Sequence, residues 1–85
     1  MVVDREKLLR TLRDRLHEAF MSRYQGAAYA RIARATGYAD GYMQAMLDAG
    51  LAAEREMLGL VGEERQRALR TEHPLQPSEH DIVAA

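Results

Sequence analysis

The chain contains no cysteine and no tryptophan, and proline occurs only twice in 85 residues. Without cysteine there is no disulfide framework and no thiolate metal site. No apolar run approaches the length of about 18 residues that a membrane span needs, and the segment Met1–Lys7 lacks the apolar core of a signal peptide. We therefore expect a cytoplasmic, bacterial-type protein with no membrane association, no metal site and no cofactor.

The length allows one domain, and a chain this short buries a small core. Below about 80 residues such a core contributes roughly 3–5 kcal/mol of net stability. The composition is nevertheless globular, with 47% hydrophobic and 29% charged residues. Dimerisation is the usual remaining route to stability in the absence of disulfides and metals, so we expect a homodimer.

The net charge of −1 conceals an asymmetry between the two halves of the chain. Residues 1–39 carry eight basic and four acidic side chains, whereas residues 40–85 carry four basic and nine acidic ones. A basic half can meet a phosphate backbone. The same charges can equally belong to ordinary solvated helix faces, and the sequence leaves both interpretations open.

An amphipathic helix is predicted over residues 5–23. Its apolar residues recur at intervals of four: Leu8, Leu12, Leu16, Phe20 and Tyr24. Asp4 is the expected N-cap, and Gln25-Gly26 offers a stop at which glycine can take a positive φ. Arg13 and His17 are expected on the opposite, solvated face.

Two shorter helices are predicted next, over residues 27–36 and 41–49. Gly37 is expected to end the first of them in a tight turn, and Asp40 is expected to cap the second. Met43, Met46 and Leu47 form the inward face of the second helix at spacing i, i+3, i+4. Gly50 is expected to close it.

A final helical segment is predicted over residues 52–70, with a possible bend at Val61-Gly62 because glycine weakens a helix interior by about 1 kcal/mol. The pattern is lost from Thr71, and residues 71–85 are expected to form a flexible tail. The predicted fold is therefore all-α, a small bundle of four or five helices within residues 1–70.

Residues 29–49 resemble the helix-turn-helix DNA-binding family, in particular the small repressor-like domains of bacteria and phages. Ala33 is the small residue of such a motif, and Gly37 follows it by four positions. Met43 and Met46 stand six and nine positions beyond the glycine, where apolar residues recur in the motif. The resemblance implies that the second helix of the pair lies in the major groove of DNA.

That resemblance implies a set of DNA contacts and a regulatory function as a homodimer. In such a dimer two recognition helices stand about 34 Å apart. The implied base-reading residues are Asp40, Gly41, Tyr42, Gln44 and Ala45. The implied contacts to the DNA backbone are Arg23, Arg31 and Arg34.

A second hypothesis requires no DNA. Four of the five aromatic residues, Tyr24, Tyr29, Tyr38 and Tyr42, cluster around the motif, and core packing with the hydroxyl at the rim is the commoner use of tyrosine. Methionines at positions 43 and 46 suit a partner groove or a subunit interface as well as a core. The alternative function is a non-enzymatic helical adaptor or homodimeric interaction protein.

Enzymatic activity is not expected. His73 and His80 lie seven residues apart in the predicted tail, where there is no rigid scaffold and no histidine pair at i, i+4, so we expect no metal site there. No histidine is placed to activate Ser22 or Ser78 on sequence grounds. A phosphate-binding loop is also absent, because Gly37 and Gly41 are followed by no Lys-Ser/Thr pair.

Overall fold

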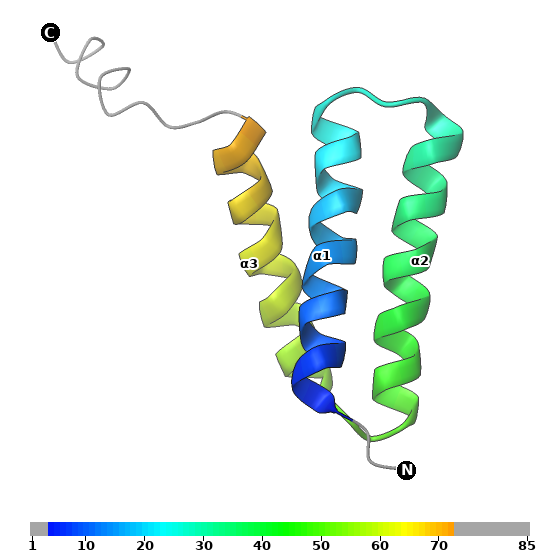
Figure 1. Ribbon diagram of the computed structural model, residues 1–85, viewed down its shortest axis with the longest axis vertical. Helices are drawn as coiled ribbons and strands as arrows, with labels where there is room; N and C mark the ends of the chain where they lie inside the picture. The colour runs from blue at the N-terminus through cyan, green and yellow to red at the C-terminus, as the bar shows by residue number, and fades with distance from the viewer. Residues whose placement is uncertain (1–3, 73–85) are drawn as a thin grey trace, which may run out of the picture.

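The computed structural model describes residues 4–72, which form three α-helices and no strand (Figure 1). The helices are α1 (Arg5–Tyr24), α2 (Tyr29–Asp48) and α3 (Glu54–Glu72). The predicted all-α class is confirmed, and the predicted number of four or five helices is wrong for the described residues. None of these helices is long and apolar enough to cross a membrane.

Helix α1 begins and ends close to the predicted positions. The carboxylate of Asp4 accepts a hydrogen bond from the backbone N–H of Lys7 at 3.1 Å, so the predicted N-cap is confirmed. Beyond the last turn, Gly26 adopts φ +70°, a conformation that glycine reaches without steric cost. The chain then reverses and enters α2 at Tyr29.

Helix α2 is continuous from Tyr29 to Asp48, and this corrects the prediction of two helices, 27–36 and 41–49, joined by a turn at Gly37. Among the described residues only Gly26 and Gly50 have positive φ, so Gly37 has no turn conformation. A helical glycine costs about 1 kcal/mol relative to alanine. The helix formers around it, together with the burial of Ala39 and Met46 against the rest of the bundle, outweigh that cost.

Helix α3 also runs without interruption, so the possible bend at Val61-Gly62 does not occur. It begins at Glu54 rather than at residue 52, and its last turn extends to Glu72. Gly50 precedes it with φ +71°, as expected for the residue that closes the helix before. The predicted tail therefore starts inside α3, and residues 73–85 lie outside the described part of the chain.

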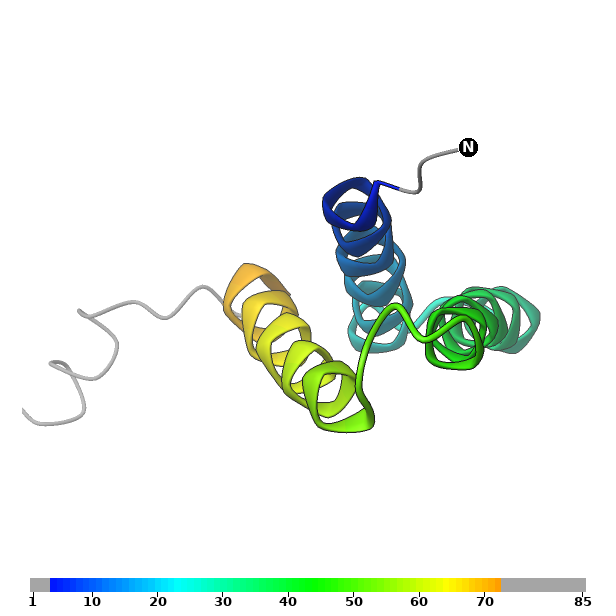
Figure 2. The same ribbon diagram turned by 90° about the horizontal axis from the view of Figure 1, so that it is seen from below.

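The three helices form an open arrangement with α1 in the middle. Both α2 and α3 pack against α1, whereas α2 and α3 touch one another only marginally (Figure 2). The core lies on α1 and on the faces that the other two helices turn toward it. Its buried members are Leu12, Leu16, Ala39, Met46, Met57 and Leu60.

Candidate binding surfaces

Most of the residues predicted to read DNA bases are accessible. Asp40, Gly41, Gln44 and Ala45 are exposed, and Tyr42 is partly buried. They all lie in the C-terminal half of the single helix α2 rather than in a separate recognition helix after a bend. Asp40 therefore occupies a helix interior and does not cap a helix, which corrects that prediction.

The predicted base-reading residues do not share one face of α2. Asp40 and Gln44 border the hollow that opens toward α3. Tyr42 and Ala45 line a different hollow, beside Leu8 of α1. A straight helix that enters a DNA groove presents one face to the bases, so the structure separates this set into two groups.

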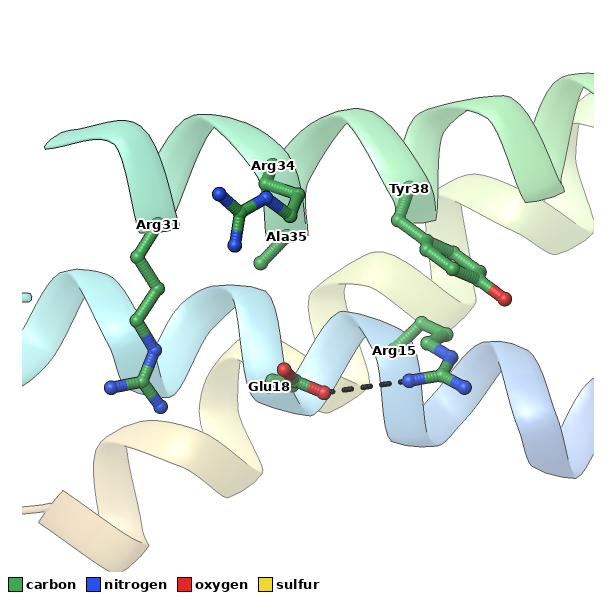
Figure 3. Close-up of a pocket in the computed structure, with 6 residues that line it drawn as sticks. All are labelled: Arg15, Glu18, Arg31, Arg34, Ala35 and Tyr38. Carbon is green, nitrogen blue, oxygen red and sulfur yellow. Dashed lines mark ion pairs between the residues drawn. The ribbon is translucent and has the colours of Figure 1, made fainter.

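The predicted backbone contacts are divided in the same way. Arg31 and Arg34 border a cavity of about 190 Å³ between α1 and α2, together with Arg15, which sequence reasoning did not single out (Figure 3). Arg23 lies elsewhere, on a hollow shared by all three helices, and its guanidinium donates to the hydroxyl of Thr36 at 3.3 Å. All three predicted arginines are exposed.

Between α2 and α3 runs a largely apolar hollow, floored by α1, that we call the interhelical groove. It consists of two adjoining cavities of about 510 and 310 Å³, which share Asp40, Met43 and Val61. The groove exists because α2 and α3 diverge from their common contact with α1. Its apolar lining is Leu16, Ala19, Phe20, Ala39, Met43, Leu47, Met57, Leu58 and Val61.

Ion pairs fix the position of α3, the outer wall of the groove. At its N-terminal end, Arg5 of α1 pairs with Glu56, and Arg5 Nε also donates to the carbonyl of Leu51 at 2.8 Å. The hydrogen bond from Arg5 lowers the pKa of Glu56, and the same bond raises the pKa of Arg5.

About two turns further along α1, Arg13 reaches two carboxylates of α3. Its Nη1 lies 3.1 Å from an oxygen of Glu63 and 3.1 Å from an oxygen of Glu64, and these bonds raise the pKa of Arg13. The Glu64 side chain is 3% exposed and is also held by Arg67 at 2.6 Å. The Arg13 side chain, predicted on the solvated face, is 43% exposed, and the sequence did not predict its ion pairs with α3.

The spacing of residues in α3 contains a signal for the ion pair between Arg13 and Glu64. Glu64 continues the spacing of Met57, Leu60 and Ala68, which are all buried. A carboxylate in such a stripe indicates a buried charge with a cationic partner, because an unpaired one is costly to bury. The sequence does not indicate which arginine supplies the partner.

Two further polar side chains of α1 are partly or fully buried. His17, predicted on a solvated face, is partly buried, and its Nδ1 has no hydrogen-bond partner in the described part of the chain. Ser22 is buried and donates from its hydroxyl to the carbonyl of Ala19 at 2.8 Å. His73, His80 and Ser78 lie outside the described residues.

Residues 4–72 contain no group of three or more histidine, cysteine or carboxylate side chains that could hold a metal ion. No protein-family model, curated protein sequence or solved structure matches the chain. The candidate binding surfaces are the interhelical groove and the arginine-lined cavity between α1 and α2.

Proposed function

We propose that the protein is a non-enzymatic helical interaction protein that acts as a homodimer, with a second copy covering the interhelical groove. The observation that carries this proposal is the sparse contact between α2 and α3, which leaves apolar side chains of all three helices open on one side. Contiguous apolar surface of this kind on a small domain marks an interaction site.

A second copy is the occupant that the chain itself favours. Leu58 of α3 is 66% exposed beside the groove, next to the partly buried Val61. A domain of this size has little core to offset the exposure of such side chains, and dimerisation supplies the missing burial. The same face then serves both copies, as in any two-fold symmetric interface.

The charges at the ends of the groove favour an antiparallel, groove-to-groove arrangement. Glu54 borders the groove where α3 begins, and Arg23 borders it near the end of α1. A two-fold axis across the groove brings the acidic end of one copy to the basic end of the other. The exposed Ala33 and Gly37 of α2, with open space around Gly37, allow the two backbones to approach closely.

Sedimentation equilibrium of the purified full chain tests this proposal. The parent protein is expected to be a dimer, and Leu58→Asp or Met43→Asp is expected to give a folded monomer, because each places a carboxylate in the apolar contact. Tyr29→Asp, at an 84% exposed position outside the groove, is the matched control and leaves the dimer intact. The proposal is refuted if the parent protein is a monomer at concentrations on the order of 100 μM, or if Leu58→Asp is still a dimer.

DNA binding is the second candidate, supported by the exposure of Arg31, Arg34 and Gln44. If the protein binds DNA, the continuous helix α2 contacts the duplex without a bend between two shorter helices. Arg31→Ala and Arg34→Ala then weaken binding to all sequences and flatten its dependence on salt, whereas Gln44→Ala relaxes preference at particular base pairs. Unchanged mobility of mixed genomic fragments at low salt, with folded protein in excess, excludes this candidate.

A further inference from the structure

The cavity between α1 and α2 has an unbalanced charge. Three guanidinium groups, from Arg15, Arg31 and Arg34, line it together with a single carboxylate, that of Glu18 (Figure 3). The Glu18 carboxylate is already engaged, since its oxygen lies 3.6 Å from Arg15 Nη1. Within residues 4–72, Arg31 and Arg34 make no ion pair, so two positive charges face the cavity without a counter-charge.

Arg15 is held by Glu18 and by Tyr38, and its Nε lacks an acceptor. Its guanidinium carbon lies 4.5 Å from the centre of the Tyr38 ring, a cation–π contact that fixes the plane of the fork. Its Nε is buried and has no hydrogen-bond partner in the described part of the molecule. Buried donors in folded proteins are nearly always paired, so an acceptor at this position is expected.

The start of α2 adds to the positive potential of the cavity. Arg31 lies in the first turn, the N-cap residue Ala28 provides no side-chain acceptor, and that turn contains no acidic residue. The positive end of the helix dipole is therefore not offset by a carboxylate. This potential acts together with the three guanidinium groups.

We propose that this cavity binds a small dianionic phosphate, either inorganic phosphate or the terminal phosphate of a small monoester. Guanidinium forks match phosphate oxygens in geometry and charge. The volume of about 190 Å³ lies below the range of roughly 300–1,000 Å³ typical of pockets for larger ligands. Arg31 and Arg34 contact the phosphate oxygens, and Arg15, held over the ring of Tyr38, completes the site.

The test is calorimetric titration of the purified full chain with inorganic phosphate at constant ionic strength. Saturable binding at one site per chain is expected. Arg31→Ala and Arg34→Ala are each expected to weaken it about tenfold or more, because each removes a charged hydrogen bond. Arg70→Ala removes an exposed arginine of α3 that makes no ion pair in the described residues, and it leaves binding unchanged. Equal losses in all three variants would show an unspecific charge effect and overturn the proposal.

Glu18→Gln provides a test in the opposite direction. It removes the only negative charge of the cavity and frees Arg15, so phosphate binding is expected to tighten several-fold. A weakened or unchanged affinity in folded Glu18→Gln protein contradicts the assigned geometry. No other substitution in the cavity is expected to raise affinity.

A comparison of ligands separates a dianion site from contact with a nucleic-acid backbone. Inorganic phosphate is expected to bind at least about tenfold more tightly than dimethyl phosphate, a singly charged diester like those of DNA. A short DNA duplex that binds while neither small phosphate does would assign these arginines to the nucleic-acid backbone and reject the proposal. The proposal is also rejected if the calorimetric titration shows no saturable binding of inorganic phosphate at concentrations up to the order of millimolar.

Discussion

Helices α2 and α3 both bury apolar side chains against α1, but among the described residues only α3 adds ion pairs to that packing. On the α3 side, ion pairs run along the contact, from Arg5–Glu56 to Arg13 with Glu63 and Glu64. On the α2 side, no ion pair with α1 occurs within residues 4–72. The polar contacts there are one hydrogen bond, from Arg23 to Thr36, and the stacking of Arg15 on Tyr38.

This difference predicts which wall of the interhelical groove moves when the pH or the ionic strength changes. Apolar packing is insensitive to salt and to the titration of carboxylates, whereas exposed ion pairs are screened by salt. We therefore expect α2 to keep its place on α1 across a wide range of pH and ionic strength. The position of α3, and with it the width of the groove, should depend on both.

The largest effect is expected on the α2 side, from Met46→Ala. Met46 is 3% exposed, and its truncation leaves a cavity in the core that costs about 2–5 kcal/mol of unfolding free energy. Because the lost contacts are apolar, the cost should be the same in 0.1 and 1 M salt within about 0.5 kcal/mol. Urea denaturation at both salt concentrations measures it.

Met43→Ala is the matched control for that measurement, since Met43 is partly buried and borders the open groove. Its cost should be smaller, because the site is only partly enclosed. A cost for Met46→Ala that changes strongly with salt would remove the distinction between the two sides.

The second effect concerns the α3 side, through Glu64→Gln. The carboxylate of Glu64 is nearly inaccessible and is held by Arg13 and Arg67, so neutralising it should cost about 1–3 kcal/mol. Glu63→Gln is the matched control, because Glu63 shares Arg13 but is 65% exposed, and should cost less than about 1 kcal/mol. Equal costs would mean that burial of the carboxylate does not matter.

Sequence reasoning predicted the parts of this fold that local chemistry determines. The capping carboxylate of Asp4, the positive φ of Gly26, the end of the helix before Gly50, and the inward face formed by Met43, Met46 and Leu47 all occur as expected. Each of these depends on residues within one or two helical turns. The all-α class follows from the same local patterns.

The errors arose where tertiary packing opposes a local preference. Gly37 is a weak helix residue, yet it lies within α2, because the packing of that helix on α1, with Ala39 and Met46 buried, outweighs the local cost. The cavity with Arg15, Arg31 and Arg34 could not be assembled from the sequence, since Arg15 stands far from the other two along the chain. Its position depends on how α1 and α2 align.

The smallest effect is a pH dependence at the exposed end of the α3 contact. The hydrogen bond from Arg5 holds the pKa of Glu56 below its ordinary value of 4.5. A carboxylate whose pKa is lowered in the folded state stabilises the fold fully at pH values above its unfolded-state pKa. That stabilisation is lost as the pH falls through the folded-state pKa. Urea denaturation should therefore show that the parent exceeds Glu56→Gln in stability at pH 7, that the difference falls as the pH drops below 4.5, and that it is lost below the folded-state pKa of Glu56. In an Arg5→Gln background, the stability difference caused by Glu56→Gln should be nearly the same at every pH, because the interaction that shifts the pKa of Glu56 is gone. A difference that persists in that background would assign the effect to another group and weaken the contrast between the two walls of the groove.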